Sequence, residues 1–256
     1  MSSVQAVNLK GKRQAPSAED MLRVWEIGQF QTLPEQALTL LGVYCEEVPR
    51  ADLERLNIGK RDSLLLALRE QLFGSQFSGM TSCPGCQTNL EVAFNSSEVR
   101  AEVFSDPETT FPLSFGEYEF TCRLPDSADL LVVVRGANVG SIKDSLLERC
   151  LLEKRHLGKD IPLVNIPSEA IERIAVEFGK RDPQADIRLA LVCPDCSLHW
   201  EAIFDIVSFV CNEVSVWACR LLRQVHELAS AYGWRERDIL AMSSLRRETY
   251  LEMLGE

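Results

Sequence analysis

Apolar and polar residues alternate at helical spacing through the first quarter of the chain. Ser17 and Thr32 each begin a capping-box pattern, which predicts helices over about 18–27 and 34–44. The run "KRDSLLLALREQLFG" predicts a further amphipathic helix that ends at Gly74, since glycine is favoured just past the end of a helix. The polar stretch "SQFSGMTS" that follows is interpreted as a linker.

The longest predicted helix covers about residues 205–232. Its apolar positions step by three and four residues and so lie on one stripe: Val207, Val210, Cys211, Val214, Ala218, Leu221, Val225 and Leu228. Gly233 ends this helix, and the remaining tail predicts a short helix and a terminal one that begins near Ser243.

The middle of the chain has a mixed pattern. "EYEFTCRL" alternates and predicts a strand, whereas "SIKDSLLERCLLEKRHLG" predicts one helix from a capping Ser141 to a terminating Gly158. "SEAIERIAVEFG" predicts another helix that ends at Gly179. "DLLVVVRG" is a strand by composition but a helix if Ser127 caps it, and its pattern leaves both open.

Composition places the chain among globular proteins. It has 256 residues, of which 46% are hydrophobic, and no apolar run reaches the roughly 18 residues that cross a bilayer. The first 17 residues carry basic side chains without an apolar run behind them, which predicts a flexible arm rather than a signal peptide. We therefore expect a cytoplasmic protein whose nine cysteines form no structural disulfides.

The net charge is −11, and the stretch 97–186 supplies −6 of it, with 11 Lys/Arg against 17 Asp/Glu. No basic block offers an electrostatic footprint for nucleic acid, so the acidity is interpreted as a contribution to solubility. The chain also lacks a glycine-rich phosphate loop and a nucleophile elbow, and no set of residues indicates a reaction. We expect a protein that is not an enzyme and binds no nucleic acid, membrane or small-molecule substrate.

One twelve-residue phrase occurs twice, as "CPGCQTNLEVAF" from Cys83 and "CPDCSLHWEAIF" from Cys193. A Cys-x-x-Cys is either a redox dithiol that opens a helix or half of a zinc site on a tight turn. Both copies are followed by alternating, strand-like residues, and "IRLALV" precedes the second copy. The flanks favour two hairpins whose turns carry the thiols.

Structural zinc takes four ligands, and each copy supplies two. We therefore predict one structural Zn²⁺ per chain, bound by Cys83, Cys86, Cys193 and Cys196. The 106 residues between Cys86 and Cys193 exceed the usual spacing of about 20, which indicates an inserted region. Redox chemistry and unrelated core cysteines are the alternatives, and the nearby His199 is expected to lie at the surface or in packing.

The run from Phe204 to Leu254 carries F-D, S-F, V-H-x-L-A, Y-G-W, I-L, R-R and Y-L-E in that order. With these motifs, the two cysteine phrases and "IGKRDSLLLALREQLFG", most of the chain resembles proteins encoded with contractile phage tails and related contractile injection systems. It is similar in particular to baseplate hub-assembly proteins of contractile-tailed phages. This resemblance implies a non-enzymatic role in building or forming a baseplate, with baseplate or hub proteins as partners. It also implies that the cytoplasmic protein is either free or within an assembled phage-tail-like particle.

These observations predict an α+β fold with split zinc-ribbon-like hairpins and an inserted mixed region. The expected parts are an N-terminal helical region at 1–79, a ribbon at 80–96 with 187–204, an acidic α/β insertion at 97–186, and a C-terminal helical module at 205–256. The expected function is that of a non-enzymatic structural or assembly (chaperone-like) protein of the baseplate of a phage-tail-like contractile machine, and a structural zinc is expected to stabilise the protein itself. A zinc-ribbon nucleic-acid-binding regulator and a thiol oxidoreductase are the alternatives.

Four residues near the C-terminus are candidate partner-binding residues: Trp234, Arg246, Arg247 and Tyr250. Aromatic residues and arginine are the types most often found as interface anchors. The alternative is that Tyr250 and Leu251 pack on the long helix while the arginines stay solvated.

Overall fold

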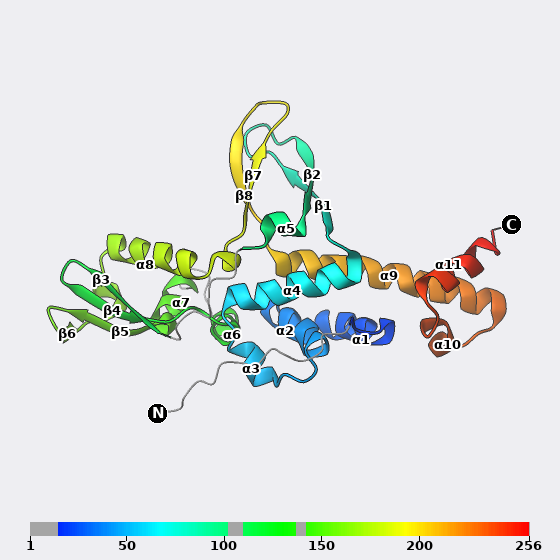
Figure 1. Cartoon of the computed structure of the whole chain (residues 1–256), viewed down its shortest axis with the longest axis horizontal. Helices are drawn as coiled ribbons and strands as arrows, with labels where there is room; N and C mark the ends of the chain where they lie inside the picture. Colours follow the sequence, from blue (N-terminus) through cyan, green and yellow to red (C-terminus); the bar gives the residue numbers. More distant parts are fainter. Residues whose placement is uncertain (1–14, 102–109, 137–141, 256) are drawn as a thin grey trace.

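The computed structural model describes residues 15–101, 110–136 and 142–255. A body of helices occupies the centre of an elongated molecule, and two hairpins project from it (Figure 1). A small sheet with its own helices lies at one end, and the last two helices lie at the other. No helix in these ranges is both long and apolar enough to cross a membrane.

Four helices begin the described chain: α1 (Ala18–Gly28), α2 (Leu33–Tyr44), α3 (Arg50–Glu54) and α4 (Ile58–Phe73). The hydroxyl of Ser17 accepts a hydrogen bond from the Asp20 backbone at 3.1 Å, and Thr32 forms a capping box with Glu35. Gly74 ends α4 with a φ of 86°, a conformation that favours glycine. The helices predicted for this region are confirmed.

Two hairpins carry the repeated phrase. Strand β1 (Gln76–Ser82) pairs antiparallel with β2 (Asn89–Asn95), and β7 (Arg188–Val192) pairs with β8 (His199–Ile203). The linker predicted at "SQFSGMTS" is wrong, because most of it is β1. Phe77 supplies the buried contact that fixes this otherwise polar strand, opposite Phe94. A single helical turn, α5 (Ser96–Val99), follows β2.

The inserted region contains a four-stranded antiparallel sheet in the order β3-β4-β5-β6. Its strands are β3 (Phe111–Phe115), β4 (Tyr118–Cys122), β5 (Leu151–His156) and β6 (Lys159–Asp160). Helices α7 (Ile142–Cys150) and α8 (Ser168–Arg181) pack with it around a core that includes Phe111, Phe120, Leu151 and Ile174. Short 3-10 turns cover Leu163–Asn165 and Pro183–Ala185.

The single helix predicted from Ser141 to Gly158 is wrong in its second half. The helix ends at Cys150, and the next six residues form β5, because pairing with β4 buries Leu151 in the sheet core. Gly158, with a φ of 75°, lies in the turn to β6 instead of ending a helix. The proposed cap Ser141 lies outside the described residues.

The segment "DLLVVVRG" is helical, in α6 (Ser127–Gly136). Asp126 provides the cap, since its carboxylate accepts a hydrogen bond from the Asp129 backbone at 2.9 Å. The Ser127 hydroxyl, which was the expected cap, is buried and has no hydrogen-bond partner. Helix α6 packs against α2 and α3, and Leu131 belongs to the core of the helical body. This part of the inserted region is therefore packed into that body.

Helix α9 (Ile206–Tyr232) joins the helical body to the C-terminal end. Its buried residues follow the predicted stripe, with Cys211 only half-buried. Asp205 caps its first turn, and Gly233 ends it in the left-handed conformation at a φ of 70°. Helices α10 (Glu236–Leu240) and α11 (Ser244–Glu252) then pack back on α9. The predicted C-terminal helices are confirmed.

Candidate metal centre

The turns of the two hairpins are built in the same way. The backbone N–H of Cys83 donates to the Thr88 carbonyl at 2.9 Å, and that of Cys193 donates to the Leu198 carbonyl at 2.9 Å. The residue after the second cysteine of each pair has a positive φ, 63° at Gln87 and 58° at Ser197. The repeated sequence therefore folds into a repeated turn that presents two sulfurs.

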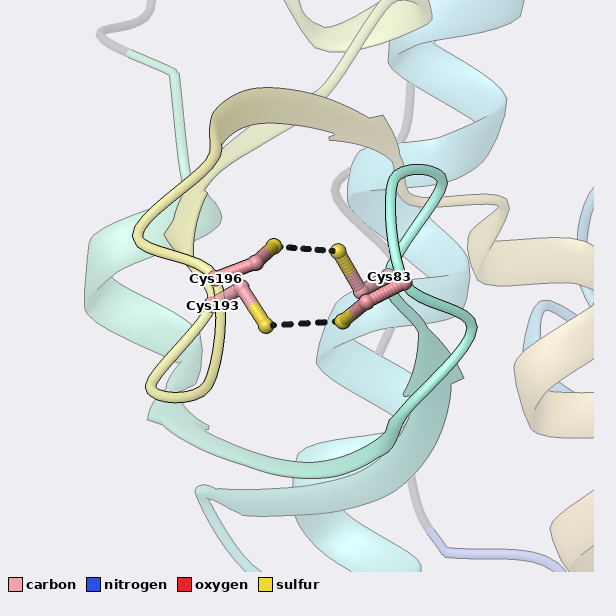
Figure 2. A group of neighbouring side chains, drawn as sticks. Cys83, Cys193 and Cys196 are labelled. Carbon is pink, nitrogen blue, oxygen red and sulfur yellow. Dashed lines mark hydrogen bonds between the residues drawn. The ribbon is translucent and has the colours of Figure 1, made fainter.

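The two turns face each other and bring four sulfurs together (Figure 2). The Sγ atoms of Cys83, Cys86, Cys193 and Cys196 all lie within 4.8 Å of one another. Cys83 lies 3.6 Å from Cys196, and Cys86 lies 3.5 Å from Cys193. Cys83 and Cys193 are buried, whereas Cys86 and Cys196 are exposed. Four thiols at this separation are a donor set that suits one tetrahedral metal ion.

The pKa values of three cluster thiols are shifted in different directions. Hydrogen bonding with Thr88 lowers the pKa of Cys86 to about 6, and a hydrogen bond from the Cys86 backbone lowers the pKa of Cys83. A hydrogen bond from the Leu198 backbone acts to lower the pKa of Cys196, but desolvation and the neighbouring sulfurs raise it to about 12. Close sulfurs ionise together only when a cation compensates their charge, so metal binding would release protons.

A side-chain contact outside the sulfur cluster also joins the turns. The hydroxyl of Thr88 donates to the Asp195 carboxylate at 2.7 Å, between residues 107 positions apart. Gly85 faces the opposite turn so closely that an added Cβ would lie 3.0 Å from Leu198 Cδ2. Neither contact is predictable from the sequence, since neither residue type has a spacing that would reveal its partner.

The bases of the hairpins are joined by phenylalanines. Phe94 and Phe204, the last residues of the two phrases, make an edge contact with ring centroids 5.1 Å apart. Phe77 stacks on Phe94 at 5.0 Å, and Phe209 of α9 lies 5.1 Å from Phe77. Both hairpins are thus anchored on the start of α9.

Arg69 of α4 packs against this phenylalanine cluster on the side of the helical body. Its guanidinium lies 3.8 Å from the ring centroid of Phe77 and donates two hydrogen bonds to Glu213 of α9, at 2.8 and 2.7 Å. A third bond, at 2.6 Å, reaches the carbonyl of Gly74 at the end of α4. One buried side chain therefore fixes the entry to β1 against both helices.

Other residues with metal-binding side chains lie apart from the cluster. His199 is an exposed residue at the start of β8 and does not belong to the four-sulfur group. Burial raises the pKa of Cys122 to about 11 and that of Cys150 to about 12, so these core thiols stay protonated. Cys219 is exposed on α9.

The candidate partner-binding residues gather where α9, α10 and α11 meet. Tyr232 and Trp234 stack at 4.4 Å, and Tyr250 makes an edge contact with Trp234 at 4.8 Å. The guanidinium of the exposed Arg246 lies 5.7 Å from the Tyr250 ring. The predicted residues Trp234, Arg246 and Tyr250 therefore lie together at the C-terminal end of the molecule.

Arg247 differs from Arg246 in its surroundings. It is buried, and it donates hydrogen bonds to the Met242 carbonyl at 2.5 Å and to the Gln224 side chain at 3.2 Å. Its guanidinium therefore holds α11 against α9. Partner binding through Trp234, Arg246 and Tyr250 stays a prediction, and Arg247 has a demonstrable role inside the chain.

A family model described as "T4 bacteriophage base plate protein" matches residues 30–210. The match covers more than two thirds of the chain and includes both hairpins and all four cysteines of the cluster. It excludes α1 and most of α9, together with the C-terminal helices. Neither the curated proteins nor the solved structures contain a match to the chain.

Proposed function

The chain belongs to the family of T4 bacteriophage base plate proteins, and we propose that it acts as a non-enzymatic structural or assembly protein whose fold is closed by one zinc ion. Its partners would be other baseplate or hub proteins of a contractile tail-like particle. The two parts of this proposal, the zinc and the assembly role, rest on different observations and are tested separately.

The convergence of four sulfurs from two distant hairpins supports the zinc. Cys83, Cys86, Cys193 and Cys196 would together complete a tetrahedral coordination shell, which leaves no position for a substrate and so favours a structural role. Each hairpin is a separate two-stranded sheet, a unit that is marginally stable by itself. A metal ion bound between them would stabilise both.

The first prediction concerns metal content. The purified full-length chain should carry one zinc per molecule by elemental analysis. Structural zinc contributes on the order of 10 kcal/mol to folding in small domains, so Cys83→Ser should lose the zinc and lower the free energy of unfolding, while the Thr88–Asp195 and Phe94–Phe204 contacts keep the hairpins together. Cys219→Ser, which changes an exposed cysteine outside the cluster, is the matched control and should stay folded with its zinc. Well-folded wild-type protein without any metal would contradict the zinc proposal.

The assembly role is supported by family membership and by the shape of the molecule. The hairpin pair and the C-terminal helices both project from the helical body and offer separate surfaces to neighbours (Figure 1). The half-buried Trp234 and Tyr250, together with the exposed Arg246, combine aromatic area with a charged group at the surface, the combination common in interface anchors.

The second prediction tests this role by co-expression with the baseplate proteins of the same gene cluster. We expect a defined baseplate or hub subunit to co-purify, and Arg246→Glu to weaken this without loss of stability. Arg55→Glu, an exposed charge reversal at the end of α3, should leave the complex intact. Arg247 is unsuitable for this test, because its replacement would disturb the packing of α11.

The nucleic-acid-binding alternative predicts that nucleic acid, and no baseplate protein, co-purifies with the chain; a separate DNA-binding measurement also tests it. A net charge of −11 without a basic stripe provides no counterion-release contribution to DNA binding, so fluorescence anisotropy with duplex DNA at physiological salt should show no binding. Recovery of nucleic acid and no baseplate protein would refute the assembly role and favour a regulator.

A further inference from the structure

The four sulfurs of the cluster are not equivalent in their closest contacts. Both sulfur–sulfur hydrogen bonds run between the hairpins, Cys83 with Cys196 at 3.6 Å and Cys86 with Cys193 at 3.5 Å (Figure 2). Each of these pairs contains one exposed and one buried cysteine. An oxidant in solution would therefore react with the exposed sulfur of each pair. The buried sulfur of the same pair already lies within 3.6 Å of it and could then form the disulfide.

We propose that the metal-free cluster is an oxidation site at which peroxide forms two disulfides between the hairpins, Cys83–Cys196 and Cys86–Cys193. The hairpins then stay joined in a second chemical form. The inference rests on the proposed function only for the identity of the metal that the thiols would otherwise hold.

Each disulfide requires one peroxide molecule and forms in two steps. The exposed thiol of Cys86 transfers two electrons to hydrogen peroxide, which yields a sulfenic acid and water. The sulfur of Cys193 then attacks the sulfenic sulfur and displaces its hydroxyl, which leaves with the Cys193 proton as a second water. Cys196 and Cys83 react in the same way, so two peroxide molecules remove four electrons from one cluster.

The surrounding structure favours disulfides between hairpins over those within one Cys-x-x-Cys. The Thr88–Asp195 bond and the Phe94–Phe204 contact hold the hairpins together at both ends by contacts that do not involve the cysteines. In the first turn, the Gly85 backbone donates to the Cys83 sulfur at 3.4 Å and fixes its direction. The opposing sulfurs thus stay within reach while the metal is absent.

The consequence is that the two hairpins stay covalently linked when the metal is lost under oxidising conditions. A disulfide between Cys83 and Cys196 would span 113 residues, and one between Cys86 and Cys193 would span 107. Cross-links that close such long segments strongly restrict the unfolded chain. Disulfides within each turn would restrict almost nothing and would leave the hairpins free to separate.

The test uses the full-length chain with Cys219→Ser, stripped of metal by a chelator and treated with two equivalents of hydrogen peroxide. After remaining thiols are blocked, trypsin releases residues 70–100, which hold Cys83 and Cys86, and residues 189–220, which hold Cys193, Cys196 and the half-buried Cys211 of α9. Cys211 should carry the blocking group in treated and untreated protein alike. We expect mass spectrometry without reductant to find these two peptides joined and four fewer blocked thiols than in untreated protein. Two separate peptides, each with an internal disulfide, would overturn the proposal.

Paired substitutions test which sulfurs react. Cys86→Ser with Cys193→Ser retains the close pair Cys83 and Cys196, whereas Cys83→Ser with Cys193→Ser retains the two exposed cysteines. The first variant should join its peptides several-fold faster, and equal rates would contradict the assigned pairing. Zinc content is measured separately on untreated protein. Absence of zinc would therefore count against the proposed function alone, and disulfides within the turns would count against this inference alone.

Discussion

Replacement of Gly59 by alanine tests how the inserted region is held against the helical body. Gly59 lies in the first turn of α4, and its backbone N–H donates to the Asp182 carboxylate at 2.9 Å. A Cβ at this position would overlap that carboxylate and would lie 3.0 Å from the Cβ of Gln184. Gln184 in turn bonds the backbone of Ala101 and Val99, at 2.7 and 3.1 Å. One methyl group would therefore displace the whole contact.

The expected loss of stability follows from three contributions. A hydrogen bond to a buried charged group contributes about 1.5–3 kcal/mol, and forcing an extra methyl into a packed contact costs about 1–3 kcal/mol. Replacing glycine by alanine within a helix raises the free energy of unfolding by up to about 1 kcal/mol, which offsets part of this loss. We therefore expect Gly59→Ala to lower the free energy of unfolding by about 2–4 kcal/mol.

Urea denaturation of Gly59→Ala and Gly42→Ala measures the difference between two identical chemical changes. Gly42 lies within α2, and an added Cβ there meets no atom within 4 Å, so this control should gain up to about 1 kcal/mol. In an Asp182→Ala background the overlap with the carboxylate is absent and only the close contact with the Gln184 Cβ remains, so Gly59→Ala should cost much less there than in the wild type. Equal stability of Gly59→Ala and Gly42→Ala would show that the contact between Gly59 and Asp182 does not hold the inserted region against the helical body.

Two further predictions concern buried charges. Arg69→Met should cost about 3–5 kcal/mol in urea denaturation, because Glu213 loses both hydrogen bonds while partly buried, whereas Arg100→Met at the more exposed pair with Glu70 should cost less than about 1 kcal/mol. Similar losses would contradict the role assigned to Arg69. Desolvation raises the pKa of Asp62 from 3.8 to about 6, so the folded protein holds this proton more tightly than the unfolded chain and gains stability as the pH falls from about 6 toward 4. Asp62→Asn should remove that gain, which is at most about 3 kcal/mol, and a constant difference from the wild type between pH 4 and 7 would refute it.

Elements set by local chemistry were predictable from the sequence. The capping box at Thr32 and the glycine after α9 fix helix ends through contacts within a few residues, and the stripe of α9 follows from its own periodicity. Prediction failed where a distant partner decides. Residues 151–156 form strand β5 instead of continuing the predicted helix, because they pair with β4. The polar segment 76–82 forms strand β1 because it pairs with β2, where Phe77 lies opposite Phe94. Neither partner is visible in the local pattern.

The same limit explains how much of the candidate site could be predicted. The cysteines stood out because the phrase occurs twice, and the need for four ligands then joins the copies across 106 residues. The contacts of Thr88 with Asp195 and of Arg69 with Glu213 occur once and follow no spacing rule. They depend on the placement of the hairpins and could be found only from the structure.

The repeated phrase specifies more than a set of ligands, because its first and last residues make different contacts between the hairpins. The cysteines at its start meet across the tips of the hairpins, and the phenylalanines at its end, Phe94 and Phe204, meet across their bases. The glutamates between them, Glu91 and Glu201, are exposed. Two marginal hairpins without a shared sheet are thus joined at both ends by residues from one motif. A 106-residue insertion is compatible with this arrangement because neither junction depends on the chain between the copies.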